Sequence, residues 1–380
     1  MSNSGSDMDV EWVDEAEASE LGLSSDEQNE LFEVDPEPHS INFSGTDFDV
    51  EGLVRRLERG DIVIPSFGID DETIETAGFQ RDFVWTRPQM DRFIESLLLE
   101  YPIPGIFLVQ QRDRRYLVLD GQQRLRTLAA YYKGMHEGRE FRLKNVSAQF
   151  QGLLYEDLDE TTRRKLDNSF IPATIVQTDG SRDSLEAVYQ VFERLNSGGT
   201  QLTAHEIRVA LYAGPIIEFV SSLNLLDEWR ELYGGRSKRL RDQELVLRII
   251  ALYVSPGTYR RPLKSFLNDF AGTHRYLDDL NSDRLQEQFR QAARLVLEGP
   301  GSQGLRYGGR GLTAALTEAV FVGLMRRLET SPRPNPADVS TALDRFLARE
   351  GVADAVTRAT ADEDSVRLRL AEATREFSNI

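Results

Sequence analysis

The segment after Thr86 carries apolar residues at helical spacing. Their positions follow i, i+3, i+4, i+7 and i+8, which places them on one face of a helix. They are Met90, Phe93, Ile94, Leu97 and Leu98. Thr86 suits the N-cap of this helix, and Pro88 suits its first turn. The pattern predicts an amphipathic helix that ends at the stretch 101–104, Tyr-Pro-Ile-Pro.

Apolar runs of strand length follow this helix. Residues 106–109 and 116–119 predict two strands joined by a charged turn at 112–114, and 171–176 predicts a third strand. From about residue 216 onward, helical periodicity replaces these runs. The positions that indicate core-facing helices there are Leu245, Ile249, Ile250, Leu252, Leu316, Val320 and Leu324. The pattern predicts an α+β protein, in which a small mixed-sheet domain precedes an all-helical C-terminal domain.

The charge of the chain is unevenly distributed. The net charge is −18 at pH 7, yet residues 1–54 hold sixteen acidic residues and no Lys or Arg. Ser, Asp and Glu dominate the first part of this segment, which is typical of disorder. We therefore predict a disordered acidic arm at 1–45, a mixed α/β domain at 46–215 and a helical domain at 216–380. The arm suits a solubilising tail, a competitor of DNA for a basic groove, or a docking segment for a partner.

Composition also limits the chemistry and the location. The chain has no cysteine, which excludes a disulfide scaffold, a cysteine zinc site and a thiol nucleophile. No apolar run approaches the roughly 20 residues of a membrane helix, and the acidic N-terminus does not resemble a secretory signal. We expect a cytoplasmic protein without a membrane partner. The four histidines, His39, His136, His205 and His274, are isolated in the sequence, so we expect surface or helix-end positions and no metal site.

The segment Asp120-Gly121-Gln122-Gln123-Arg124 lies between the predicted strand 116–119 and a second amphipathic helix. A strand that turns on Gly into a helix leaves the first N–H groups unpaired at the positive end of the helix dipole, which favours an anion. Gly121 would let the backbone approach that anion, and Arg124 adds a forked donor for phosphate. Asp120 suits either a plain N-cap or a ligand of a nucleotide-bound Mg²⁺. The buried stripe of the helix is predicted as Leu125, Leu128, Ala129 and Tyr132.

Two further segments accompany this motif. Residues 79–85, Phe-Gln-Arg-Asp-Phe-Val-Trp, precede the first helix and by themselves suit an aromatic segment anchored in the core. Residues 192–202 follow the third predicted strand and suit a helix end, a Gly turn and the start of a new helix. There Thr203 and Glu206 have capping-box spacing. A loop with two glycines also exposes N–H donors, so this segment is an alternative candidate for lining a ligand pocket.

The order FQRDFVW, a helix ending YPIP, LDGQQRLRTL and FERLNSGGTQLTAHEI resembles the GmrSD restriction endonuclease N-terminal domain family, over about residues 48 to 215. That family has the ParB/sulfiredoxin-like fold, and in such relatives the segment matching Gly121–Arg124 holds the phosphates of a nucleoside triphosphate. The resemblance implies that ATP, GTP or CTP binds with Mg²⁺, and that Asp120 and Arg124 are the catalytic residues. It implies nucleotide binding by the residues Gln80, Arg81, Gly121, Gln122, Gln123, Asn196 and Gly199.

Family members occur in phage-defence systems in which nucleotide turnover accompanies DNA cleavage. Many multidomain relatives carry an HNH-type nuclease domain, which needs clustered histidines that this sequence lacks. DNA cutting would therefore come from a separate partner subunit or from the ParB-like domain itself. A cluster of basic residues suits contact with DNA phosphates, although a solvated helix surface fits it as well. The cluster comprises Arg236, Lys238, Arg239 and Arg241.

Three functions remain in view at this point. The first is an NTPase of an anti-phage system that senses DNA and controls a nuclease. The second is a DNA-binding adaptor that does not hydrolyse nucleotide. The third is a metal-dependent nuclease within the ParB-like domain. The sequence favours the first and leaves the oligomeric state open, including a homodimer.

Overall fold

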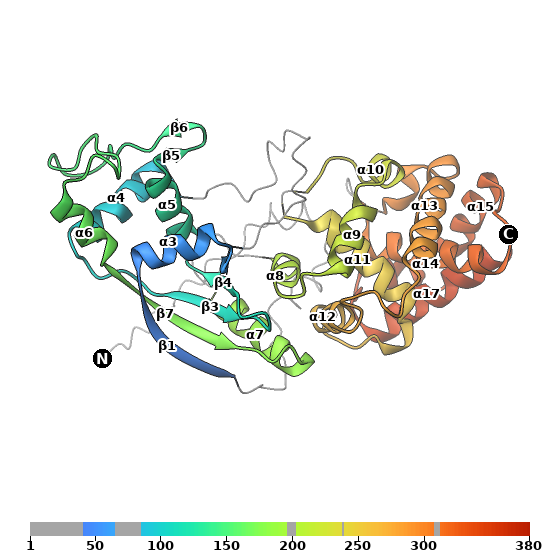
Figure 1. Ribbon diagram of the computed structural model, residues 1–380. Coiled ribbons are helices and arrows are strands. Elements are labelled where there is room, and N and C mark those ends of the chain that lie inside the picture. Colours follow the sequence, from blue (N-terminus) through green and yellow to red (C-terminus); the bar gives the residue numbers. More distant parts are fainter. Residues whose placement is uncertain (1–40, 65–84, 196–202, 238, 308–311) are drawn as a thin grey trace, which may run out of the picture. The chain divides into compact units, whose positions relative to one another are not determined.

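The computed structural model describes residues 41–64, 85–195, 203–237, 239–307 and 312–380 (Figure 1). These residues form two compact units, one that ends at Ala213 and one that begins at Gly214. The first unit combines a sheet with helices, and the second is helical wherever it is described. The predicted α+β class, with a small mixed sheet followed by a helical region, is confirmed. No helix among the described residues is long and apolar enough to cross a membrane.

The main sheet has five strands in the order β1-β7-β3-β4-β2. Strands β3 and β7 are parallel, as are β2 and β4, whereas β3 and β4 are antiparallel and β1 runs antiparallel to β7. The strands are β1 (Asn42–Asp49), β2 (Ile62–Val63), β3 (Ile106–Gln110), β4 (Tyr116–Asp120) and β7 (Phe170–Gln177). The three strands predicted from sequence are confirmed as β3, β4 and β7.

The predicted C-terminal boundary of the acidic arm, residue 45, is wrong because strand β1 begins at Asn42. Residues 42–45 were assigned to the disordered segment, but they pair with residues 174–177 of β7. The first six residues of β1 are exposed, and only Phe48 is buried. An exposed edge strand lacks the alternation of apolar and polar residues that reveals a strand in sequence, because neither of its faces is buried over most of its length. Residues 1–40 lie outside the described residues.

Helices pack on both faces of this sheet (Figure 1). On one face, buried residues of the sheet and of four helices form a single apolar core. These helices are α3 (Val50–Glu58), α4 (Arg87–Leu98), α5 (Gln122–Lys133) and α6 (Glu160–Asp167). The alternate strand residues Val109, Leu117, Leu119 and Val176 are buried on the other face, where α7 (Arg182–Leu195) contacts β4. Helix α7 in turn packs against α8 (Ala204–Leu211).

The first amphipathic helix is as predicted. Helix α4 begins after Thr86, whose capping box with Gln89 is formed, and all five of its predicted core residues are buried. The stripe of α5 is shifted from its prediction. Its buried residues are Leu125, Thr127, Leu128 and Tyr131, whereas Ala129 and Tyr132 are only partly buried. The reason is that Tyr131 packs edge-on against Phe141, with ring centroids 5.5 Å apart.

The second unit is built around helix α14 (Ala314–Thr330), which is buried along almost its whole length. It contacts α11 (Arg241–Val254), α13 (Ser282–Glu298) and α17 (Glu363–Ser378). The remaining helices are α9 (Pro215–Asn224), α10 (Asp227–Tyr233), α12 (Leu263–Thr273), α15 (Pro336–Leu347) and α16 (Val352–Thr357). All seven predicted core residues of this unit are buried. At its centre the buried Glu318 carboxylate forms ion pairs with the buried guanidinium groups of Arg248 and Arg369.

Candidate nucleotide site at the β4–α5 turn

The turn between β4 and α5 places the residues of the DGQQR motif. Asp120 is the last residue of β4, Gly121 is the N-cap, and Gln122 is the first residue of α5. Gly121 has φ +96°, and the Leu125 N–H donates to its carbonyl at 3.0 Å. The N–H groups of Gln122, Gln123 and Arg124 precede that first helical bond and lie at the positive end of the helix. A capping side chain is absent from this position, because the N-cap residue is glycine.

Only glycine fits at position 121 of this turn. Its φ lies in the left-handed region, where an L side chain is strained. A Cβ atom added at Gly121 would lie 2.4 Å from Cγ2 of Ile106 on the neighbouring strand β3. The glycine therefore allows the β4–α5 turn to pack directly on the sheet, which fixes the direction in which α5 leaves it.

Asp120 pairs with Arg124 and does not cap the helix. Arg124 Nη2 lies 2.7 Å from Asp120 Oδ2 and also donates to the Gly105 carbonyl at 3.1 Å. The Arg124 side chain is 13% exposed, whereas that of Asp120 is 51% exposed. The N-cap alternative for Asp120 is therefore wrong, because the chain begins its helix one residue later. The ion pair instead links the last strand residue to the third residue of the helix.

Arg124 keeps donor capacity beyond this ion pair. Its Nε is buried and has no hydrogen-bond partner among the residues that the structure describes. A buried guanidinium N–H without an acceptor is unfavourable, and an anion at this place would satisfy it. The orphaned donor, together with the free N–H groups of the first turn, fits the phosphate group that the sequence motif implies.

The motif is connected to the first flanking segment. Trp85, the last residue of FQRDFVW, donates its N–H to Gln123 Oε1 at 3.5 Å. The Trp85 ring also packs edge-on against Phe93 of α4, with ring centroids 5.4 Å apart. This anchors the end of the aromatic segment in the core, as its residue types predict. Gln80 and Arg81, the two predicted pocket residues of this segment, lie outside the described residues.

The third segment lies between α7 and α8. Asn196 and Gly199 fall in 196–202, outside the described residues. The predicted capping box at the start of α8 is confirmed, since Thr203 Oγ1 accepts from the Glu206 N–H at 3.1 Å and the Thr203 N–H donates to Glu206 Oε2 at 2.6 Å.

Two buried polar residues on α8 were not expected from the sequence. His205 and Arg208 are fully buried, and Arg208 Nη1 lies 3.2 Å from His205 Nδ1. His205 lies in the first turn of α8, which is one of the helix-end positions expected for the isolated histidines, although it is buried there. His274 is likewise at a helix end, as the C-cap of α12, where it is 9% exposed and lies 2.8 Å from Asp279. An isolated histidine gives no sequence signal for such a pairing, because the partner follows from the local fold.

Arg126 is a basic residue of α5 that sequence reasoning did not single out. It lies on α5 one turn after Gln122 and is partly buried. Burial lowers its pKa from the ordinary arginine value, because the charged guanidinium has lost contact with water. The second Arg of the segment Arg-Leu-Arg, placed at i+4 from Gln122, was the available sequence signal.

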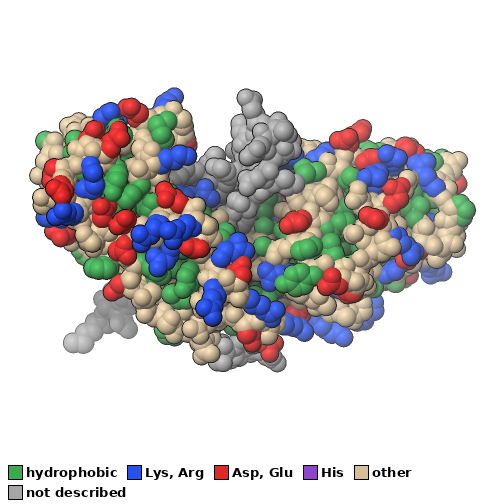
Figure 2. All heavy atoms as spheres, in the orientation of Figure 1, with side chains coloured by type: hydrophobic (Ala, Val, Ile, Leu, Met, Phe, Trp, Pro, Cys, Tyr) green, Lys and Arg blue, Asp and Glu red, His purple; other side chains and the backbone are tan. Residues whose placement is uncertain are grey.

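The predicted DNA-binding residues lie in the helical unit, between α10 and the first residue of α11, Arg241. Arg236 is exposed, Arg239 and Arg241 are partly buried, and Lys238 lies outside the described residues. Next to them the buried Asp242 carboxylate accepts from Arg230 at 2.7 Å and from Asn224 at 3.1 Å. Figure 2 shows basic and acidic side chains interspersed on the visible face, without separation by sign. Contact of these arginines with DNA stays a prediction.

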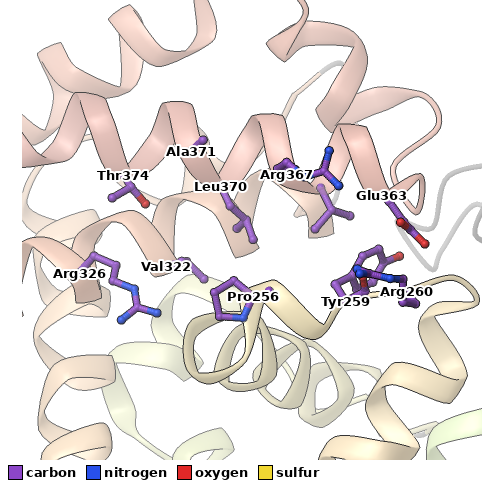
Figure 3. Close-up of a pocket in the computed structure, with 12 residues that line it drawn as sticks. Pro256, Tyr259, Arg260, Val322, Arg326, Glu363, Arg367, Leu370, Ala371 and Thr374 are labelled. Atoms are coloured by element: carbon purple, nitrogen blue, oxygen red, sulfur yellow. The ribbon is translucent and has the colours of Figure 1, made fainter.

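A groove of about 520 Å³ lies elsewhere in the helical unit (Figure 3). Val322 and Leu370 contribute apolar surface to it, and three arginines also line it. Two of these charges are paired, since Arg326 lies 3.1 Å from Glu329 and Arg367 lies 2.8 Å from Asp364. Its charge is therefore largely balanced. Among the described residues no group of three or more His, Cys, Asp or Glu side chains could hold a metal ion.

Comparison with known proteins agrees with the motif order. Residues 58–213 match the family model of the GmrSD restriction endonuclease N-terminal domain. This segment is similar to the GmrSD family. The resemblance inferred from the three motifs is thereby confirmed for this segment.

One curated relative shares part of the chain. Over 143 residues the sequence is 31% identical to an uncharacterized protein of Methanocaldococcus jannaschii, a match that covers 31% of this chain and 21% of that protein. The chain thus spans about a fifth of the relative's length. No solved structure gives a significant match. The prediction of a site at the β4–α5 turn therefore rests on the sequence motifs and on the local geometry.

Proposed function

We propose that this GmrSD-family chain binds a nucleoside triphosphate at the β4–α5 turn and hydrolyses it. The observation that carries the proposal is the partly buried Arg124, which is held at the start of α5 with a buried Nε donor that has no described partner. Guanidinium groups and helix N-termini are the two groups that proteins use most directly for phosphate oxygens. Here both come from five consecutive residues.

Different residues of the turn would contact different parts of the nucleotide. The first N–H groups of α5 would donate to one phosphate, and Arg124 would contact the same group from the sheet side. Asp120 uses Oδ2 for Arg124 and is half exposed, so Oδ1 can contact a Mg²⁺ ion that the nucleotide carries. Hydrolysis would break the bond between the last two phosphates with water as the nucleophile, giving a diphosphate and inorganic phosphate. The cations stabilise the charge that develops on the oxygens.

We further propose that turnover responds to DNA and controls a nuclease in a separate subunit. This part of the proposal follows from the restriction-like family. The described residues offer no metal cluster that would favour a nuclease within this chain. Asp120 and Arg124 are then the catalytic residues, and the cluster with Arg236, Arg239 and Arg241 is the proposed contact to DNA.

Two assays on the purified chain separate this function from the alternatives. The first measures phosphate release from ATP, GTP and CTP, with and without double-stranded DNA. The second measures cleavage of plasmid DNA in the presence of Mg²⁺. Turnover without cleavage supports the proposal. Binding of nucleotide and DNA without turnover would favour an adaptor, and plasmid cleavage by this chain alone would favour a nuclease.

A further inference from the structure

Arg126 carries a charge that nothing in the described structure balances. It is partly buried, and among the described residues it has neither an ion pair nor a hydrogen bond. Burial also lowers its pKa from the ordinary arginine value. Arg124, two residues earlier, is bound to Asp120 and to the Gly105 carbonyl. Arg124 therefore already has an anionic partner in the described structure, whereas Arg126 has none.

The helix geometry places these arginines on different sides of the first turn. Consecutive residues are turned by roughly 100° about the helix axis, so Arg124 and Arg126 leave it about 200° apart. Arg126 lies on the same face as Gln122, about 6 Å further along the axis. Long side chains on a helix lean toward its N-terminus, which directs Arg126 back over the first turn. Arg124 faces the sheet, where it contacts Gly105.

An unbalanced, partly desolvated cation costs folding free energy, because the charge loses water and gains no partner. Such a group lowers the stability of the free protein and strengthens the binding of an anion that reaches it. It therefore points to a ligand more directly than a paired arginine does.

We propose that Arg126 is a second phosphate contact, and that it makes the site prefer nucleoside di- and triphosphates to monophosphates. This inference rests on the proposed function of the β4–α5 turn. One phosphate of the nucleotide binds to the N-terminus of α5 and to Arg124. Arg126 binds the next phosphate of the same nucleotide from the other side of the first turn. A monophosphate can satisfy only the first of these contacts.

Equilibrium binding of fluorescent, non-hydrolysable triphosphates and of the matching monophosphates tests this assignment on the full chain. The variants are Arg126→Gln and Arg126→Lys, with Arg164→Gln as the control. Arg164 lies on α6, is 72% exposed and, among the residues that the structure describes, forms its ion pair with Glu160. We expect Arg126→Gln to weaken triphosphate binding about 10-fold, the loss of one charge-assisted contact, and to leave monophosphate binding unchanged. Arg126→Lys should restore part of the affinity.

Thermal denaturation without ligand supplies the second readout. Arg126→Gln should melt at the same temperature as the wild type or higher, since it removes an unbalanced charge. The assignment would be overturned if Arg126→Gln bound the triphosphate as tightly as the wild type does, or if its melting temperature were clearly lower. If the wild type binds none of the triphosphates, the proposed function itself is overturned and this inference with it.

Discussion

Arg124 and Asp120 face each other across the β4–α5 turn, with Nη2 2.7 Å from Oδ2. The same Nη2 donates to the carbonyl of Gly105, the residue that precedes strand β3. One side chain therefore connects the start of α5 to the ends of two adjacent strands. This arrangement gives Arg124 a structural role in addition to the proposed contact with phosphate, and the two roles can be measured separately.

Replacing Arg124 with Ala should destabilise the protein by about 2 kcal/mol, because the Gly105 carbonyl and the Asp120 carboxylate both lose a charged donor. Asp120→Asn should cost less, about 0.5 kcal/mol, since Asp120 is half exposed. Urea denaturation of both single variants and the double variant gives the coupling free energy of the pair. Purely additive costs would show that the ion pair contributes nothing to stability.

Gly121→Ala should destabilise the protein by about 3 kcal/mol, because the added methyl group meets Ile106 and the left-handed backbone disfavours a side chain. Gly134 at the other end of α5 provides the matched control. Its φ is +72°, but nothing lies within 4 Å of an added Cβ, so Gly134→Ala should cost only about 1 kcal/mol. Equal losses in the two variants, measured by urea denaturation, would rule out the close packing on Ile106.

Glu318→Gln in the helical unit should cost about 3 kcal/mol or more, because Arg248 and Arg369 would remain buried without a negative partner. Glu329→Gln is a suitable comparison. Glu329 also pairs with two arginines but is 26% exposed, so its replacement should cost less than about 1 kcal/mol. The melting temperatures of the two variants are compared. A smaller decrease for Glu318→Gln than for Glu329→Gln would contradict a stabilising role for the buried Glu318–Arg248–Arg369 ion pairs.

The decrease in protein stability at low pH should depend on Glu376. Hydrogen bonds from Arg349 and Arg345 lower the pKa of its carboxyl below the ordinary value of 4.5. Because the folded-state pKa is depressed, the stabilisation is complete above the unfolded-state pKa and is lost as the pH falls through the folded-state value. Glu376→Gln should therefore flatten the decrease in melting temperature below pH 4.5. Asp364→Asn, at a side chain that is 93% exposed, should leave that slope unchanged.

Binding to DNA gives a further prediction about the helical unit. Arg236 is exposed between α10 and α11, so Arg236→Ala should weaken binding to every DNA sequence alike. It should also reduce the slope of log affinity against log salt concentration by about 1, the value for one lost phosphate contact. Fluorescence anisotropy at several salt concentrations measures this slope. An unchanged slope would place the DNA contact elsewhere.

The sequence predicted those features that local patterns determine. The helix after Thr86, the strands at 106–109 and 116–119 and the Thr203–Glu206 capping box depend on residues that are neighbours in the chain, and all of them are present. The motif order was also sufficient to recognise the GmrSD family over residues 58–213.

Features that depend on contacts between distant segments could not be predicted in this way. Strand β1 exists because it pairs with β7, more than 100 residues later, and its own residues are mostly exposed. The burial of Tyr131 in place of Tyr132 depends on Phe141, which lies beyond the helix. The partner of Asp120 was four residues away, yet sequence alone could not distinguish an ion pair to Arg124 from an N-cap. That choice depended on the backbone of Gly121.

The most direct test of the nucleotide site compares phosphate release by the wild type, Arg124→Ala and the surface control Arg164→Ala, each with ATP, GTP and CTP, with and without DNA. Assays are run well below the melting temperature of Arg124→Ala, so that all three proteins are folded. The account predicts turnover of at least one nucleotide by the wild type and by Arg164→Ala, and a loss of at least 10-fold in Arg124→Ala. Equal turnover in all three proteins, or none in the wild type, would contradict it.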